Sequence, residues 1–174
     1  QIGGASKLDA DWTVYNVNGD EKTWINDASS SNYSSITAVK VTAGAKYLYN
    51  TNADANDWLV SPAIHLEADK EYKVSFYVKT SGSFKESLRL AVANANTADA
   101  MATKSETLLD FPELTEKTFV KKSVVYVARE SGDYYFGLYE YSKKDLYNVF
   151  VTAFSVAENI TTPAPATGLT ATEG

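Results

Sequence analysis

The stretch NDWLVSPAIHL, residues 56–66, decides the fold because it reads as one strand with a proline in its middle. Residues 58–60 begin the strand with large apolar side chains, Ser61 and Pro62 interrupt it, and residues 63–66 resume it. Proline has no N–H group to donate to a sheet, so it occupies an edge, a bulge or a point where a strand leaves one sheet for another. In a fold of two packed sheets, Pro62 therefore predicts an edge or a crossing between the sheets.

The segment that follows, EYKVSFYVK (71–79), alternates apolar and polar residues with the period of a half-buried strand. The side chains predicted to face inward are those of Tyr72, Val74, Phe76 and Val78 and, in 87–93, those of Leu88, Leu90 and Val92. Other segments rich in β-branched and aromatic residues are expected strands; they are 12–17, 34–41, 46–50, 121–128, 132–141 and 148–156. Only the Ala-rich segment 96–103 is typical of a short helix. The sequence therefore predicts an all-β fold, a two-sheet antiparallel β-sandwich.

The composition of the 174 residues limits the classes of partner. Hydrophobic residues make up 44% and charged residues 22%, and the formal net charge is −6 with a pI of about 4.8. Nucleic acids and anionic membranes need clustered cations, so this charge argues against both as partners. No apolar run approaches the ~20 residues that cross a bilayer, so membrane insertion is not expected. The absence of cysteine excludes disulfides, zinc–thiolate sites and cysteine nucleophiles.

The character of the chain changes after residue 158. Residues 159–174, NITTPAPATGLTATEG, have few large apolar side chains and carry Pro163 and Pro165. This composition is typical of an extended linker. The sequence therefore predicts a β-sandwich adhesin-like domain over 1–158, followed over 159–174 by a linker or the start of another module.

Four segments together resemble the cleaved-adhesin and choice-of-anchor domains of Bacteroidetes surface proteins. They are NDWLVSPAIHL followed by YKVSFYVK, WTVYNVNGDEKTW (12–24), GDYYFGLYEYSKKDLYNVFVTAFSV (132–156), and PAPATGLTATEG, which is similar to the opening of a fibronectin type III module. The resemblance spans both ends and the middle of the chain. It implies a jelly-roll, galactose-binding-like sandwich in a secreted or cell-surface multidomain protein. It also implies adhesion to host proteins, haem proteins or glycans, with other domains of the same chain as further partners.

Two segments rich in Asn and Asp are candidates for a structural calcium site, because calcium takes about six to eight oxygen ligands. The candidate ligands are Asn16, Asn18 and Asp20 in the first segment and Asp54 and Asp57 in the second. The alternative is that these residues only form turns, through side-chain-to-backbone hydrogen bonds. Relatives in the family that this chain resembles often carry paired acidic or amide residues in the last strand, and these help to hold calcium. This chain has Thr152 and Ala153 at that place, which argues against such a site. No cofactor is required under either interpretation.

Outward-facing tyrosines are the candidate ligand platform, because sugar-binding sandwiches stack the flat face of a sugar on an exposed aromatic ring. Alternation places Tyr135, Tyr139 and Tyr141 opposite the inward Tyr134, Phe136 and Leu138, and it turns Tyr77 outward as well. The tryptophans at positions 12, 24 and 58 each begin or end a strand, where an aromatic that seals the core is expected. The alternative for the tyrosines is a half-buried ring that covers a sheet edge and keeps a hydrated hydroxyl.

Catalysis has little support in the sequence. His65 is the single histidine, and a strand would place it about 13 Å from Ser61, too far for a catalytic pair. The G-x-S-x-G and H-E-x-x-H motifs are both absent. The 22 acidic residues guarantee some chance proximity, but nothing selects a carboxylate pair for glycoside hydrolysis.

These observations predict a non-catalytic binding or adhesion domain that recognises a glycan or a host surface protein through its loops and one outer sheet face. A structural spacer without a ligand of its own is the main alternative, and a glycan-degrading enzyme is the third.

Overall fold

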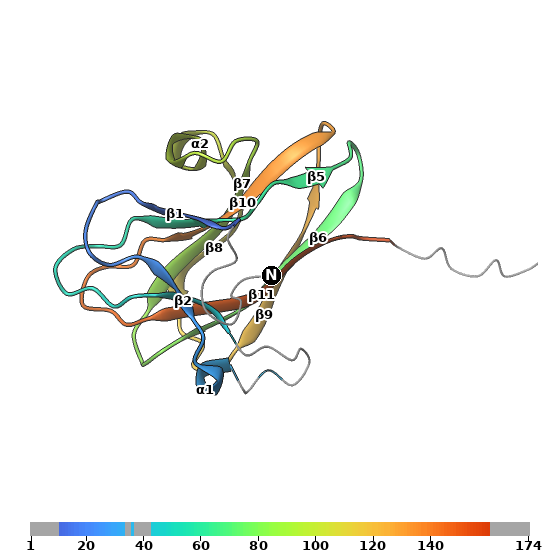
Figure 1. Ribbon diagram of the computed structural model, residues 1–174. Helices are drawn as coiled ribbons and strands as arrows, with labels where there is room; N and C mark the ends of the chain where they lie inside the picture. Colours follow the sequence, from blue (N-terminus) through green and yellow to red (C-terminus); the bar gives the residue numbers. More distant parts are fainter. Residues whose placement is uncertain (1–10, 34–35, 37–42, 161–174) are drawn as a thin grey trace, which may run out of the picture.

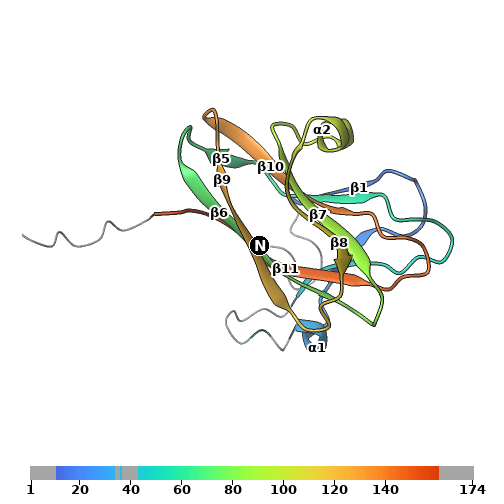
Figure 2. The same cartoon turned by 180° about the vertical axis from the view of Figure 1, so that it is seen from behind.

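The computed structural model describes residues 11–33, 36 and 43–160, which form two sheets packed face to face (Figures 1 and 2). The first sheet has the order β1 (Thr13–Asn16), β4 (Asp57–Val60), β10 (Gly132–Glu140), β7 (Glu86–Ala93) and β8 (Glu106–Leu114), with β5 (Ile64–Leu66) also paired to β10. The second has the order β2 (Trp24–Asp27), β3 (Gly44–Tyr47), β11 (Val149–Glu158), β6 (Glu71–Thr80) and β9 (Val120–Val127). All of these strand pairs are antiparallel. The predicted antiparallel sandwich of jelly-roll type is therefore confirmed.

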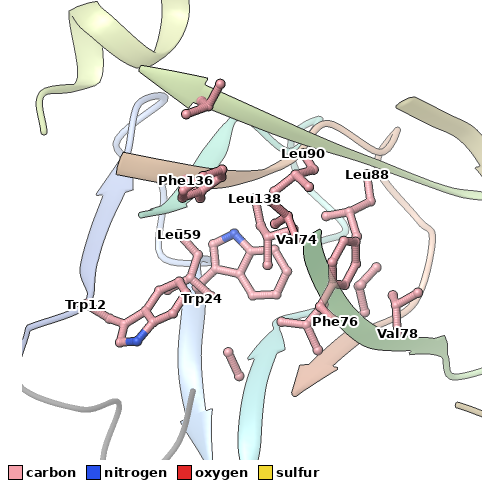
Figure 3. Packing of buried hydrophobic residues seen from close by; sticks show 14 of the residues in the cluster. Trp12, Trp24, Leu59, Val74, Phe76, Val78, Leu88, Leu90, Phe136 and Leu138 are labelled. Carbon is pink, nitrogen blue, oxygen red and sulfur yellow. The ribbon is translucent and has the colours of Figure 1, made fainter. Parts of the chain in front are cut away.

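The core lies between the sheets and is built from the positions that alternation turns inward (Figure 3). Members that are fully closed to solvent include Val74, Phe76 and Val78 of β6, Leu88 and Leu90 of β7, and Phe136 and Leu138 of β10. Trp12 and Trp24 belong to the same cluster, as expected for aromatics that seal a core. Burial of each such side chain contributes about 1.5–3 kcal/mol, so the inward face of each strand is strongly determined.

Pro62 interrupts one strand within a single sheet, so of the two predicted alternatives the crossing between sheets is wrong. The edge alternative fits, because β5 pairs only with β10 among the described strands. The strands before and after it, β4 and β5, both pair with β10. Val60 pairs with Gly137 and Ile64 with Tyr134, so four steps along one side face three along the other. One extra residue on one side of a strand pair is what defines a β-bulge. A bulge accommodates a proline while the chain stays in the same sheet.

The side chain of Ser61 keeps the sheet hydrogen-bonded at this interruption. Its hydroxyl accepts the Phe136 N–H at 3.0 Å, and its own N–H donates to the Phe136 carbonyl at 2.9 Å. The same hydroxyl donates to the Pro62 carbonyl at 2.8 Å. Ser61 therefore has a structural role, and its hydroxyl proton is already donated to a backbone carbonyl.

Two helices lie in the described residues, α1 (Ser30–Tyr33) and α2 (Ala98–Thr103). The second confirms the helix predicted over 96–103, and the Thr97 hydroxyl caps it by accepting the Ala100 N–H at 3.1 Å. Neither helix is long and apolar enough to cross a membrane. The strand predicted over 34–41 lies outside the described residues, apart from Ile36, which is buried and not in a strand.

The edge strand β8 is an element that the sequence analysis does not predict. Pro112 lies within it, and most of its side chains are exposed or half-buried, so no clean alternation is visible. β8 pairs only with β7 among the described strands, and a proline is tolerated on such an edge.

The last strand, β11, contains the second irregularity of the fold. Its pairing with β6 shifts between Thr152 and Ser155, and Ala153 has a φ of 49°, in the left-handed region. The buried Thr152 hydroxyl donates to the Ala43 carbonyl at 2.8 Å. Thr152, one of the two residues noted in the sequence analysis for the last strand, therefore bonds to the backbone. The linker predicted over 159–174 lies, from residue 161 on, outside the described residues.

Candidate functional site

The outer face of the first sheet is partly covered by α2, which adds a small hydrophobic layer outside the main core (Figure 1). Ala100 and Met101 of α2 belong to one cluster with Trp58 of β4 and Ala91 of β7. Gly137 of β10 permits the close approach, because a Cβ there would lie 2.7 Å from both the Met101 Sδ and the Trp58 Cε3 atoms. Trp58 therefore belongs to this outer layer and not to the core between the sheets.

Trp58 begins a run of three stacked aromatic rings on this face, which we call the aromatic run. Tyr139 lies opposite Trp58 in the strand register, and their ring centroids are 4.5 Å apart with an interplanar angle of 22°. Tyr141 continues the run at 5.4 Å from Tyr139, with an angle of 14°. Two of the four predicted ligand-binding tyrosines, Tyr139 and Tyr141, are thus brought together on the outer face.

Polar side chains contact the two tyrosines of the aromatic run and hydrogen-bond to their hydroxyl groups. The Arg89 guanidinium carbon lies 5.9 Å from the Tyr139 centroid and 5.2 Å from the Tyr141 centroid. The Asp110 carboxylate accepts from Arg89 Nη2 at 3.2 Å and from the Tyr141 hydroxyl at 2.5 Å, and the Tyr139 hydroxyl donates to Asn56 Oδ1 at 3.0 Å. Burial, together with the Asp110 carboxylate, raises the pKa of Tyr141 to about 12, and burial raises the pKa of Tyr139. Both hydroxyls therefore remain protonated donors at neutral pH.

A cavity of about 240 Å³, which we call the α2 pocket, opens between the aromatic run and α2. Its lining includes Asn56, Trp58, Arg89, Met101, Ser105 and Tyr139. The buried Arg89 Nε has no hydrogen-bond partner among the described residues. A buried donor without a partner costs free energy. Nε itself is closed to solvent, but the Arg89 side chain as a whole is 34% exposed, so the rest of its guanidinium can donate to a ligand. The volume is slightly below the roughly 300–1,000 Å³ of drug-sized ligand pockets, so it suits one unit of a larger polar molecule.

Of the four predicted tyrosines, Tyr139 lines this pocket; Tyr141 stacks on Tyr139 without lining it, and the other two lie apart from it. Tyr135 is on the same outer face, half-buried against the layer that contains Ala93, but it does not line the α2 pocket. Tyr77 is on the second sheet, where it packs against a cluster that includes Phe150, and the Lys121 ammonium lies 6.0 Å from its ring centroid. Tyr77 is therefore remote from the candidate site and serves as a natural control position.

The Asn- and Asp-rich segments meet at one end of the sandwich, where their polar groups bind one another. The Asn16 amide donates to the Asp20 carbonyl at 2.5 Å, and the Asn18 amide donates to the Asp20 carboxylate at 2.8 Å. Asn18 also donates to the Asp54 carbonyl at 3.0 Å, and the Asp54 carboxylate accepts from Lys143 at 2.7 Å, a bond that lowers the pKa of Asp54. Among the described residues, no group of three or more His, Cys, Asp or Glu side chains could hold a metal ion. The contacts of these four residues are those of turns and a surface ion pair.

Asp57, the remaining candidate calcium ligand, faces the interior beside two other carboxyl groups. It is opposite Glu140 in the register and accepts the Tyr47 hydroxyl at 3.0 Å. Asp57, Glu86 and Glu140 are all 0% exposed. Burial raises the pKa of each group, and Glu86 and Asp57 raise the pKa of Glu140 further. Because they are closed to solvent, these carboxyl groups cannot flank a glycosidic bond as a catalytic pair.

His65 and Ser61 make separate contacts and do not form a pair. His65 is exposed, and its Nδ1 lies 3.1 Å from the Asp133 carboxylate, whereas Ser61 is buried and bonded to Phe136. The geometry therefore provides no Ser–His nucleophile at this stretch.

The antiparallel sandwich is a fold that this chain shares with adhesin and carbohydrate-binding domains of known structure. The K1 cleaved adhesin domain of Lys-gingipain from Porphyromonas gingivalis W83 is similar, with a TM-score of 0.66 and 16% identity over 89% of this chain and 95% of that one. The K2 cleaved adhesin domain of Lys-gingipain has a TM-score of 0.64 and 16% identity, covering 90% of this chain and 94% of that one. TmCBM61, solved in complex with β-1,4-galactotriose, has a TM-score of 0.58 and 12% identity, covering 86% of this chain and 90% of that one. No protein-family model matches the chain, and no curated protein matches it.

These identities establish a shared fold. The predicted resemblance to cleaved-adhesin domains is therefore confirmed at the level of the fold. The resemblance of the C-terminal segment to a fibronectin type III module stays a prediction.

Proposed function

We propose that the chain is a non-catalytic carbohydrate-binding domain whose ligand enters the α2 pocket. The observation that carries the proposal is the combination of the stacked Trp58 and Tyr139 rings with the partly exposed Arg89 guanidinium in the lining of one small cavity. A sugar ring has apolar C–H faces and a rim of hydroxyl groups. Trp58 and Tyr139 would contact the faces, and Arg89 and the Asn56 amide would bind the rim.

The size of the pocket favours a glycan over a host protein. A stable protein–protein interface buries about 800 Å² on each partner, whereas this site is one concave cavity beside a helix of six residues. The fold adds support, because a structurally similar domain was solved with β-1,4-galactotriose. A secreted or cell-surface location is part of the proposal and rests on the similarity to adhesin domains.

A glycan array probed with the wild-type chain and the Arg89→Met variant tests this proposal. Methionine keeps an apolar stem beside the tyrosines but removes the guanidinium donors. A hydrogen bond from a charged donor contributes about 1.5–3 kcal/mol, so we expect a roughly 10- to 100-fold loss of affinity for the glycan that the wild type binds best.

The matched control is Tyr77→Ala, which removes an outward tyrosine from the second sheet and should leave the array profile unchanged. Thermal melting verifies that both variants are folded. Equal binding by wild type and Arg89→Met would contradict the α2 pocket as the site. No binding to any glycan would contradict the proposed function and favour the spacer interpretation.

A further inference from the structure

Three exposed aromatic rings stack at the loop end of the sandwich, away from the α2 pocket. Tyr49 follows β3, Phe84 lies between β6 and β7, and Tyr147 lies between β10 and β11. Their exposed fractions are 38%, 41% and 44%. Phe84 and Tyr147 have ring centroids 5.0 Å apart at 13°, and Tyr147 and Tyr49 have centroids 5.2 Å apart at 27°. We call this set the loop stack.

Hydrogen bonds from the surrounding loops hold the backbone of the loop stack in place. The Tyr147 N–H donates to Oε1 of the buried Glu86 at 2.6 Å. The Tyr49 N–H donates to Asn148 Oδ1 at 2.8 Å, and the Asn148 N–H donates to the Ser81 hydroxyl at 3.2 Å. Three separate loops are thus tied together before any ligand arrives, which lowers the entropy cost of binding.

Gly82 shapes the same surface. Its φ of 143° is one that side-chain-bearing residues rarely adopt, and a Cβ there would lie 3.3 Å from a Phe84 ring carbon and 3.6 Å from Tyr147 Cγ. The backbone of the loop between β6 and β7 therefore lies directly against two of the three rings.

Two lysines next to the loop stack hydrogen-bond to neighbouring side chains, and one of them is paired with a carboxylate. The Lys85 ammonium binds the Glu113 carboxylate at 2.9 Å, and the Lys117 ammonium donates to the Ser83 hydroxyl at 3.0 Å. The Lys85–Glu113 pair carries no net charge, whereas Lys117 keeps its positive charge because a hydroxyl does not neutralise an ammonium group. The apolar rings are therefore the main surface that this region offers to a ligand.

We infer that the loop stack is a second, independent binding site for a neutral saccharide. An aromatic side chain covers about 150–250 Å², so three rings at these exposures present roughly 200–300 Å², too little for a stable protein interface of about 800 Å² per partner. A pyranose ring has an apolar face of matching size. None of the three residues lines the α2 pocket, so this site does not depend on the function proposed for that pocket.

The test is a titration of the Arg89→Met chain with β-1,4-galactotriose and, separately, xylohexaose, up to about 10 mM to detect millimolar affinity. Aromatic ring resonances are followed by NMR, and the ligand-induced shifts of Tyr49 and Tyr147 are the readout. We expect these shifts in the Arg89→Met chain, and their loss when Phe84→Leu is added. Leucine keeps apolar bulk at an exposed position without a ring, so the fold should persist.

The outcomes separate the two sites. Shifts confined to Trp58 and Tyr139 in the wild type would overturn the loop stack as a saccharide site and leave the α2 pocket standing. Loop-stack resonances that stay unmoved by both saccharides, or that move equally in Phe84→Leu, would also overturn it. Shifts at the loop stack alone in the wild type would support this inference and show that these two saccharides do not enter the α2 pocket.

Discussion

Glu140 ends β10 with its carboxyl group fully closed to solvent, a costly position for a charge. One of its oxygens accepts the Ser142 N–H at 3.2 Å, and the other has no partner among the described residues. Burial is the main cause that raises the pKa of Glu140 well above its usual value, and the carboxyl groups of Glu86 and Asp57 add to it. The neutral form is therefore the one that the folded state prefers.

This preference predicts a pH-dependent stability that Glu140→Gln would change. A raised folded-state pKa gives stability that is fully present below the unfolded pKa of about 4.3 and is lost as pH rises through the folded pKa. Gln cannot ionise, so the variant should melt close to the wild type at pH 4 and higher than it at pH 8, by on the order of 5 °C. Thermal melts followed by circular dichroism across this range measure the difference.

The exposed Glu67, which pairs with Lys70 at the surface, gives the matched control. Glu67→Gln should shift the melting temperature by less than about 1 °C at every pH, because exposed ion pairs contribute little. Parallel melting curves for wild type and Glu140→Gln from pH 4 to pH 8 would contradict a neutral buried Glu140.

At the scale of elements, the contact between α2 and β10 depends on one glycine. A Cβ at Gly137 would overlap Met101 and Trp58, so Gly137→Ala should destabilise the fold by about 1–3 kcal/mol and loosen α2. Chemical denaturation gives the loss of stability, and amide hydrogen exchange over residues 98–103 reports the loosening. Gly132→Ala, on the same strand but with no atom within 4 Å of the added Cβ, should do neither. Equal stability of the two variants would contradict the packing of α2 described above.

The strands that alternate cleanly were predictable, and the irregular ones were not. In β6 and β7 the burial of one face imposes a period of two, and the inward residues were identified correctly. The sequence cannot distinguish a bulge at Pro62 from a crossing between sheets, because neither arrangement needs an N–H group from the proline. Only the pairing of β4 and β5 with β10 distinguishes them. β8 was missed because an edge strand buries little and carries Pro112.

The candidate site shows the same limit. Alternation turned Tyr139 outward, and it would also have turned Arg89 outward, since its neighbours Leu88 and Leu90 face the core. Alternation does not predict which strands are neighbours in the sheet. The proximity of Arg89 to Tyr139 therefore cannot be predicted from the sequence. Trp58 was assigned to the core because the short helix that covers it lies forty residues further along the chain, at Ala98.

On the scale of the whole molecule, the sandwich is a rigid frame that presents aromatic rings on two surfaces. One surface is the outer face of the first sheet, where α2 and the Trp58 and Tyr139 rings line a pocket. The other is the loop end, where the loop stack lies above the buried Glu86. If both proposals hold, the two sites together would bind a long or clustered glycan more tightly than either site alone, because the second contact would be intramolecular.

The central claim is that a glycan enters the α2 pocket, and the indole N–H signals of the three tryptophans test it most directly. Trp58 lines the pocket, whereas Trp24 is in the core with its Nε1 donating to the Asp57 carbonyl at 3.3 Å, and Trp12 also belongs to the core cluster. Titration of the ¹⁵N-labelled chain with the glycan that binds best on the array should shift the Trp58 signal and leave the other two in place. A Trp58 signal that does not move at saturating glycan would contradict the account.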